Sequence, residues 1–421
     1  VIRNLTAASS QHCSPKMSEL GPSSFGRTVR LSAVLGIVLI SVVTASAAEV
    51  EDDDDRTIDD VGTSVPAEVL RAKRSQAERE GFSVLGGVST FWGEDDNLYQ
   101  SPPELAERGR MWGSWGYLRT DSRVGANRFL NTVKFKQEQY PGHWLIDAAY
   151  LKSSNWFTRP LTSTIDLELD LDVSHQNDAS ANIAGRDYAQ DYGYWRYAGE
   201  TVLEWKPSSR HRVRLGAERV IKDYEETPGL VSVDWTQWMA SASYRVRLIG
   251  GQSASASYAT GYRDYKDEPA AESSGRELPT NPAERHRYRE LALKYSIPLT
   301  RRADLEVGYS RDSKEDLFQG YESRRSEGFH AEVGVEALPG VELRLAGARS
   351  WRDYQHILAD AGRPLSYRLQ EASVGSRVHV LAPTWVFFQL SYFERDTNKS
   401  TGTLYRDHTG TVTRTGVNVF F

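Results

Sequence analysis

The sequence has little of what would build a disulfide-rich or helical membrane protein. Its 421 residues include one cysteine and three methionines. A single cysteine, Cys13, excludes an intramolecular disulfide framework. Long apolar runs are also missing: the best candidate, Leu31 to Val43, spans 13 residues, whereas a membrane helix needs ~20. A bundle of membrane helices is therefore excluded.

Aromatic and charged residues are plentiful instead. The chain contains 11 Trp, 21 Tyr and 13 Phe, and 26% of its residues are charged. This composition favours exported β-structure over a cytosolic enzyme, and all-β barrels often exceed the usual domain length.

The N-terminal part has the layout of a secretory signal peptide. Arg27 and Arg30 supply positive charge, the apolar run follows, and Ala45 to Ala48 offers a small-residue cleavage site. We predict a signal peptide over residues 1–48, with translation starting at Met17 and an upstream extension before it. No cysteine stands at the cleavage site, which excludes a lipoprotein anchor.

The segment 49–81 is predicted to be an acidic disordered stretch followed by a short helix. Residues 49–60 carry a net charge of −7, residues 1–48 carry +3, and the formal net charge of the chain is −6, which leaves −2 for the remainder. Such a block of like charge repels itself. Pro66 can open a helix that continues to Glu80 and ends at Gly81, and we place this segment in the periplasm or at the mouth of a barrel.

From Phe82 onward the apolar residues recur with period two. Between Thr164 and Val173 apolar and acidic residues alternate without an error. Successive strand side chains point to opposite faces, so one face of this segment is apolar and the other is acidic. A single strand of this kind could also belong to a soluble β-sandwich, with its acidic face in water. The number of such strands decides between a sandwich and a membrane barrel.

The same alternation returns in segments beginning near residues 212, 291, 305, 329, 341, 372 and 386, with charged residues on the opposite face. That much charge cannot form a dry core, but it can line a water-filled lumen while the apolar faces meet lipid. Short turns alternate with longer polar stretches at 174–193, 265–284, 312–325, 355–365 and 397–410. We predict an all-β, transmembrane antiparallel barrel over residues 82–421, with about 16 strands and 14 as the alternative.

The C-terminal residues resemble the β-signal of Gram-negative outer-membrane proteins. That signal consists of a polar residue, a glycine, an apolar residue and a terminal aromatic residue at fixed spacing, and Arg414, Gly416, Val419 and Phe421 occupy these places. The resemblance implies an outer-membrane location and recognition by the barrel assembly machinery.

Aromatic residues near the predicted strand ends indicate a belt at the membrane interface. They are Trp235, Trp238, Tyr258, Tyr262, Tyr309, Trp351, Tyr354 and Tyr392.

The candidate lumen residues lie on three neighbouring predicted strands. They are Asp166, Glu168, Asp170, Asp172, Glu200, Glu204, Arg212 and Arg214. Same-face neighbours on a strand are ~6.8 Å apart, so the acidic ladder could share a divalent cation. The alternative is a solvated pore wall balanced by the two arginines, which we favour.

Three further arginines, Arg285, Arg287 and Arg289, share the parity of lipid-facing Leu291 and lie toward the extracellular end. Arginine suits bidentate phosphate contact, so they are candidates for binding lipopolysaccharide, with a solvated loop edge as the alternative.

No catalytic constellation, phosphate loop, cofactor motif or His/Cys metal spacing stands out, so we expect neither an enzyme nor a cofactor or metal. The expected partners are outer-membrane lipid, lipopolysaccharide, the assembly machinery and periplasmic export components, without nucleic acid. The leading hypothesis is a water-filled channel for small solutes or an exported polymer such as a polysaccharide. The alternatives are an assembly or secretion accessory barrel that acts through a partner, and a structural or adhesive surface barrel.

Overall fold

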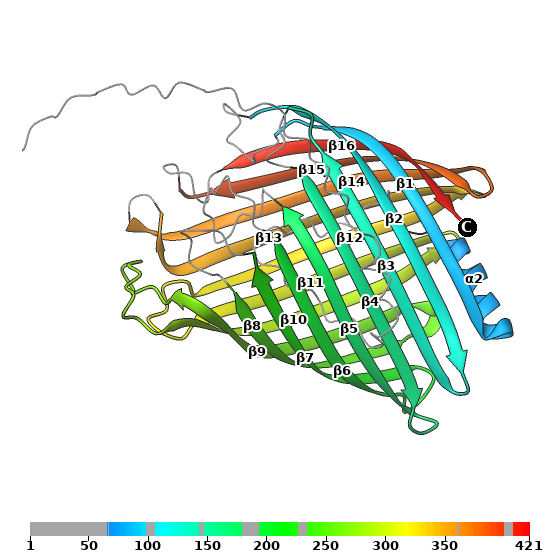
Figure 1. Cartoon of the computed structure of the whole chain (residues 1–421), viewed down its shortest axis with the longest axis horizontal. Helices are drawn as coiled ribbons and strands as arrows, with labels where there is room; N and C mark the ends of the chain where they lie inside the picture. The colour runs from blue at the N-terminus through cyan, green and yellow to red at the C-terminus, as the bar shows by residue number, and fades with distance from the viewer. Residues whose placement is uncertain are drawn as a thin grey trace, which may run out of the picture. The chain divides into compact units, whose positions relative to one another are not determined.

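Sixteen antiparallel strands close into one barrel. The computed structural model describes residues 65, 67–97, 106–142, 147–178, 193–225, 234–359, 362–399 and 407–421. Each strand pairs with its sequence neighbour, and β1 pairs with β16, as Figure 1 shows. The predicted fold and the count of 16 are confirmed, and the alternative of 14 is wrong. The signal peptide and the acidic stretch were predicted for residues that lie outside the described ones.

The first half of the barrel comprises β1 (Phe82–Asp95), β2 (Gly109–Val124), β3 (Asn127–Gln139), β4 (Ala148–Pro160), β5 (Ile165–Asp178), β6 (Tyr194–Trp205), β7 (His211–Tyr224) and β8 (Trp235–Arg247). The second half comprises β9 (Ser253–Pro269), β10 (Ala283–Thr300), β11 (Ala303–Asp316), β12 (Arg324–Leu338), β13 (Val341–Leu358), β14 (Pro364–Leu381), β15 (Thr384–Thr397) and β16 (His408–Phe420). A short 3-10 helix, η4 (Ile249–Gly251), connects β8 to β9.

The helix α2 (Ala67–Glu80) precedes the barrel, as the sequence predicts. It ends at Gly81, whose φ of 73° is a conformation that glycine adopts without steric cost. The Gly81 amide donates a hydrogen bond to the Ala77 carbonyl at 2.9 Å, which completes the last turn. Among the described residues, no helix combines the length and the apolar character needed to cross a membrane.

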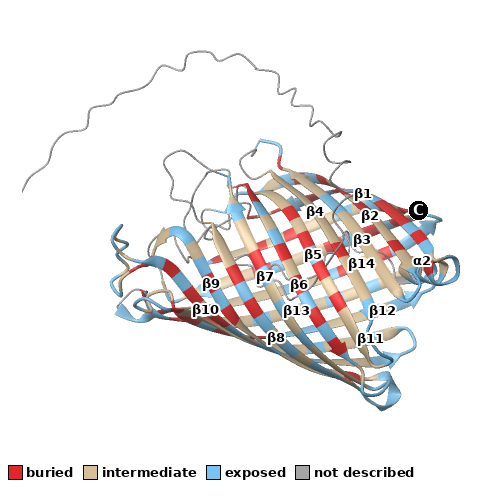
Figure 2. Cartoon of the chain, turned by 60° about the horizontal axis from the view of Figure 1, so that its bottom comes forward, coloured by how far each residue is buried: buried red, intermediate tan, exposed pale blue. Residues whose placement is uncertain are grey.

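Burial alternates along the strands because successive side chains face opposite sides of the barrel wall. On β5, Asp170 and Asp172 are buried while Leu171 is exposed, and on β6 Glu204 is buried while Leu203 is exposed. The alternating colours in Figure 2 show the same pattern around the wall. Carboxylates thus face the interior, and leucines form the outer surface.

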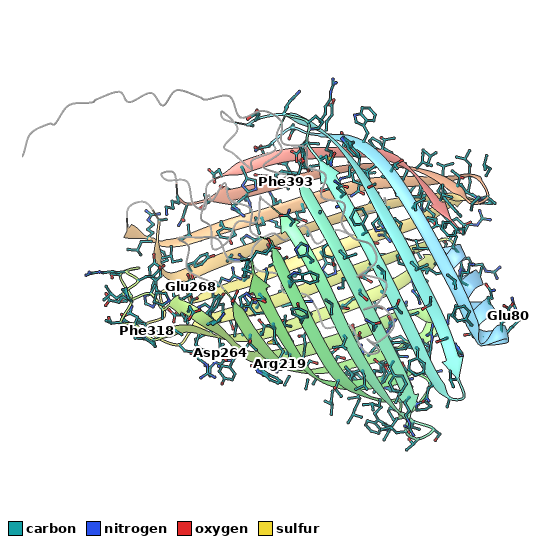
Figure 3. All side chains as sticks on the ribbon, viewed as in Figure 1. Glu80, Arg219, Asp264, Glu268, Phe318 and Phe393 are labelled. Atoms are coloured by element: carbon teal, nitrogen blue, oxygen red, sulfur yellow. The ribbon has the colours of Figure 1, made fainter. Side chains whose placement is uncertain are left out.

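The two ends of the barrel differ. Turns at one end are short, such as Gly125–Ala126 and Pro339–Gly340, and this short-turn end also holds α2 and the C-terminus (Figure 1). Longer connections gather at the opposite, long-loop end. Figure 3 places Glu80 at the short-turn end and Glu268 and Phe318 at the long-loop end.

Several strands continue past their predicted ends. β9 reaches Pro269, β11 reaches Asp316 and β13 reaches Leu358. In these extensions the outward residues are charged, as in the pair of Arg287 with Glu315 on β10 and β11. The alternation of polarity therefore stops while backbone pairing continues.

The connection between β10 and β11 is short and comprises Arg301 and Arg302. β10 runs to Thr300, with an irregularity in its pairing between Pro298 and Thr300. Proline is tolerated at such bulges because no ladder hydrogen bond is required of it there.

β1 and β16 close the barrel with a continuous register, in which Thr90 is opposite Val417. The Phe421 amide donates to the Gly86 carbonyl at 2.9 Å, and the Gly86 amide donates to the Phe421 carbonyl at 2.8 Å. Within the described part of the chain each strand therefore has a paired neighbour on both sides, which removes the edge strands of an open sheet.

Candidate functional site: the barrel lumen

The acidic ladder lies on the inner face of β5, and a second pair of carboxylates joins it from β6. Asp170 is opposite Glu200 and Asp166 is opposite Glu204 in the register. Glu168, Asp170 and Asp172 are all buried, and so are Glu200 and Glu204. Two adjacent strands therefore concentrate carboxylates on one part of the lumen wall.

Cations from β4 and β7, and Lys206 just after β6, compensate part of this charge. Arg214 Nη2 lies 2.6 Å from Glu168 Oε2, and Arg212 Nε lies 3.2 Å from Glu204 Oε2. Lys152 Nζ lies 2.7 Å from Asp172 Oδ2. At the short-turn end, Lys206 Nζ lies within 2.7 Å of carboxylate oxygens of Asp166 and Glu204.

The middle of the ladder is not compensated in this way. Within the described part of the chain, neither carboxylate oxygen of Asp170 has a hydrogen-bond partner, and the same holds for Oε2 of Glu200. Burying an unpaired carboxylate in a dry interior is very costly. Asp170 is buried, so this part of the wall holds a carboxyl group without a partner between carboxylates that are compensated.

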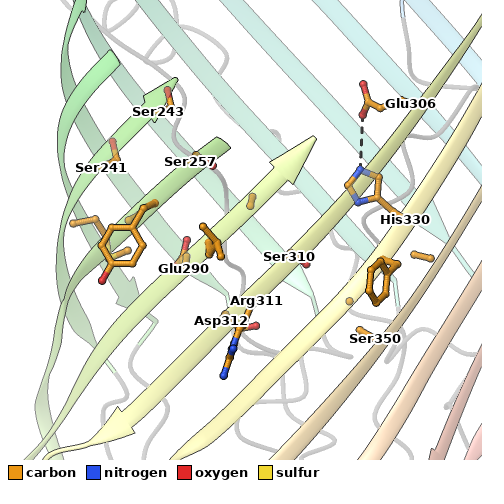
Figure 4. Close-up of a pocket in the computed structure, with 18 of the residues that line it drawn as sticks. Ser241, Ser243, Ser257, Glu290, Glu306, Ser310, Arg311, Asp312, His330 and Ser350 are labelled. Carbon is orange, nitrogen blue, oxygen red and sulfur yellow. Dashed lines mark ion pairs between the residues drawn. The ribbon is translucent and has the colours of Figure 1, made fainter. Parts of the chain in front are cut away.

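A cavity of about 610 Å³ lies inside the barrel next to this wall. Serines from neighbouring strands line it, among them Ser241, Ser243 and Ser257, and Figure 4 shows them converging on the open space. Charged side chains also line it, and His330 Nε2 lies 3.8 Å from Glu306 Oε1 (Figure 4). Hydroxyl, carboxylate and imidazole groups can each exchange hydrogen bonds with a polar solute.

The sequence did not predict a second part of the lumen wall, which is apolar and lies near the closure of the barrel. Side chains from β1, β2, β15 and β16 point inward there and, with Tyr140 just after β3, form two buried clusters. The first contains Phe91, Met111, Tyr140, Phe387, Phe393 and Val412, and the second contains Leu85, Trp115, Tyr117, Trp385 and Phe420. These aromatic residues all have inward parity, which could have indicated an apolar inner face. On β1, however, both faces are apolar, so the period of two alone does not distinguish the inner face from the outer one.

Helix α2 packs on the second cluster from inside the barrel mouth. Val69 and Leu70 contact this cluster, and Glu78 Oε1 lies 3.2 Å from Nη2 of Arg123 on β2. Arg123 has the same parity as the lumen-facing Tyr117 on β2. The helix therefore occupies part of the opening at the short-turn end.

Three residues of the β-signal, Arg414, Gly416 and Val419, lie on β16 at the closure of the barrel, and Phe421 directly follows this strand. Arg414 faces the lumen and its Nη2 lies 2.9 Å from Glu138 Oε1. A Cβ atom on Gly416 would lie 2.3 Å from the backbone oxygen of Thr90, so the close approach of β1 requires glycine there. Val419 and Phe421 occupy the opposite, outward parity, and Phe421 is exposed. Their recognition by the assembly machinery stays a prediction.

The three rim arginines lie outside the barrel at the long-loop end, and each has a carboxylate nearby. Arg285 Nε is 2.8 Å from Asp264 Oδ1. Arg287 pairs with Glu315, and Arg289 Nη2 is 3.8 Å from the same carboxylate. A lipid phosphate would compete with these partners, and binding of lipopolysaccharide stays a prediction.

Two members of the predicted aromatic belt point into the barrel instead. Trp235 carries the Arg263 guanidinium 4.0 Å above its ring, and Tyr354 is buried. Trp235 is opposite Tyr265 and Tyr354 is opposite Arg324 in the strand register. Directly opposite residues share a face of the sheet, and Tyr265 and Arg324 face inward. The belt assignment was wrong for these two residues.

The other belt positions lie on the outer face. Trp238, Tyr258, Tyr262 and Tyr392 are exposed there. Tyr309 and Trp351 are half-buried, and both rings contact Phe329.

A closed antiparallel barrel with an apolar outer surface and a charged interior is the architecture of Gram-negative outer-membrane proteins, because a membrane span must satisfy every backbone hydrogen bond internally. The protein is an outer-membrane β-barrel of this class. Short turns lie on the periplasmic side in such barrels, so the short-turn end is periplasmic and the long-loop end is extracellular.

Solved structures with a similar fold include OccAB1 of Acinetobacter baumannii, at 10% identity and a TM-score of 0.48 over 81% of this chain and 97% of that one. The outer membrane channel DcaP of Acinetobacter baumannii is 12% identical, with a TM-score of 0.46 over 82% of this chain and 98% of that one. An anion-selective porin from Comamonas acidovorans is 11% identical, with a TM-score of 0.44 over 81% and 99%. Likeness at this level concerns the fold alone. No protein-family model and no curated protein matches the chain.

Proposed function

We propose that the protein is a passive, water-filled channel for small polar solutes across the outer membrane. A barrel of 16 strands is wide enough to leave an aqueous passage, whereas eight strands are filled by their own side chains. The apolar wall and α2 narrow this passage on one side. The remaining opening is lined by charged groups and serines.

The observation that supports this proposal most directly is the polar cavity of about 610 Å³ inside the barrel. It adjoins the incompletely paired carboxylates around Asp170. Serine hydroxyls and charged side chains that line a cavity can hydrogen-bond to water in it, and water inside a membrane barrel provides a path for hydrated solutes. Export of a polymer, or secretion through a partner, would need structural features beyond this cavity. The experiment below distinguishes these functions from a channel for small solutes.

The test is swelling of liposomes that contain the purified protein, in a series of neutral sugars of increasing size. Ser241 lines the cavity, while Ala240 is exposed on the outer face. We expect Ser241→Trp to slow the entry of the larger sugars, and Ala240→Trp to leave it unchanged. No swelling with wild-type protein, or equal swelling for both variants, would contradict a passage through this cavity and favour a barrel that acts through a partner.

A further inference from the structure

A compact cluster of three potential metal ligands lies at the extracellular end of the barrel, apart from the acidic ladder. Glu284 and His286 are near the start of β10, and Glu322 belongs to the connection between β11 and β12. Glu284 and His286 are buried, while the Glu322 side chain is 28% exposed. An ion from the extracellular side could therefore reach the cluster past Glu322.

The ligand atoms of these three side chains converge. His286 Nε2 lies 2.6 Å from Glu284 Oε1 and 3.8 Å from Glu322 Oε2. All three ligand atoms lie within 4.8 Å of one another. Atoms bound to one metal at ~2.0–2.2 Å are separated by comparable distances, so only small side-chain shifts would be needed.

Apart from its close approach to Glu284, the imidazole of His286 has no polar partner among the described residues that satisfies it. Its side chain is 0% exposed, yet neither ring nitrogen has a hydrogen bond of acceptable geometry within the described part of the chain. Buried polar groups are normally hydrogen-bonded, and each exception asks for a physical reason. The rings of Tyr265 and Tyr288 stand edge-on to the imidazole, with centroids at 5.5 and 6.2 Å, and they hold Nε2 toward the two carboxylates.

We propose that Glu284, His286 and Glu322 form a binding site for a zinc ion at the extracellular mouth. One imidazole and two carboxylates are a typical zinc ligand set that leaves a fourth position for water. Calcium and magnesium prefer all-oxygen sites, so the histidine selects against them. The site joins β10 to the β11–β12 connection, and it is independent of whether the lumen conducts solutes.

Lys314 is the competing cation in this cluster. Its Nζ lies 2.6 Å from Glu322 Oε2 and its side chain is largely buried. Zinc and the ammonium group compete for the same carboxylate, so a zinc ion must displace Lys314 or share Glu322 with it. Removing this ammonium group should therefore strengthen zinc binding.

The experiment is calorimetric titration of the full-length barrel in detergent with zinc chloride. Wild type should bind one zinc ion, and excess magnesium should not displace it. His286→Ala should weaken binding by at least about tenfold, because even a group that only supports a metal ligand is typically worth that much. His330→Ala, a matched change of the lumen histidine beside Glu306, should have no effect, and Lys314→Met should tighten binding.

Heat-modifiability on gels establishes that each variant is a folded barrel. X-ray absorption of the zinc-loaded protein should show only nitrogen or oxygen ligands, with the outer-shell scattering of one imidazole ring. Two results would overturn the proposal: equal loss in the His286 and His330 variants, or no zinc binding by wild type, whether or not binding appears after Lys314 is replaced. Binding in the Lys314 variant alone would mean that the lysine is the permanent cation of the cluster.

Discussion

Arg214 on β7 reaches across β6 to Glu168 on β5, and its Nη2 lies 2.6 Å from Oε2 of that carboxylate, although the two residues are 46 positions apart. The same guanidinium places Nε 3.8 Å from Oε2 of Glu204. A single arginine thus compensates carboxylates on two strands. Its side chain is 36% exposed, so water screens these contacts and they contribute little to stability. Their main consequence is the electrostatic potential of the lumen.

We expect a weak preference of the channel for cations, caused by the ladder of Asp166, Glu168, Asp170 and Asp172. Carboxylates on a low-dielectric wall concentrate cations, while the neighbouring arginine and lysines offset part of the field. Changing all four acids to their amides should lower the cation-to-anion permeability ratio about two- to threefold, or roughly 0.5 kcal/mol. Reversal potential across a salt gradient measures this ratio.

The matched variant is Arg214→Gln, which should shift the reversal potential in the opposite direction. Both shifts should shrink as salt rises, because the screening length is only ~8 Å at 0.15 M. An unchanged potential in the amide variant would mean that these four residues do not face the conducting path.

The two faces of β5 should respond differently to the same substitution. Leu169 has the parity of the exposed Leu171, whereas Asp170 is buried on the inner face. Leu169→Arg should destabilise the inserted barrel by roughly 2–4 kcal/mol, the cost of arginine facing lipid near the membrane midplane. Asp170→Arg should cost much less, since its neighbours Glu200 and Glu168 are carboxylates. Heat-modifiability on cold gels compares the two, and equal loss would refute the assigned facing.

If the C-terminal residues are recognised as an assembly signal, removing a signal side chain should reduce insertion even when the backbone hydrogen bonds are kept. Phe421→Ala keeps the two backbone hydrogen bonds to Gly86 but removes the exposed ring. We expect several-fold less inserted protein, with synthesis and export intact. Val417→Ala, an equally outward change on the same strand outside the signal positions, is the control. Wild-type insertion of the Phe421 variant would exclude the signal role.

Helix α2 should restrict the channel at its periplasmic mouth. Val69 and Leu70 are partly buried against the aromatic cluster, so their contribution is below the ~1.5–3 kcal/mol of a fully buried side chain each. Replacing both with Asp should release the helix and raise the conductance, and Ala72→Asp, at an exposed position, should not. Equal conductance of all three proteins would mean that α2 lies outside the narrowest part of the path.

The strand faces could be predicted because period two fixes them wherever one face is apolar and the other charged. β5 is the clearest case: its parity placed Asp166 to Asp172 on one side, and the structure places them on the inner side of the wall. The strand count followed from the same repetition. The predicted strand ends were less accurate. Where the strands extend beyond the membrane, charged residues occupy both faces while backbone pairing continues.

Features that join distant segments could not be predicted in this way. The apolar wall combines Phe91 with Phe387, which are brought together only when β1 closes on β16. The position of α2 against this wall depends on the same closure of the barrel. The meeting of His286 with Glu322 depends on how a long connection folds back over β10, and no spacing pattern in the sequence indicates it.

The conductance of single molecules of the purified protein in a planar bilayer tests the central claim most directly. A water-filled lumen predicts stable open steps whose size rises in proportion to salt at high concentration, with larger steps when α2 is released. Silence from wild type and from the α2 variant alike, in protein shown by heat-modifiability to be folded, would contradict an open passage through the barrel.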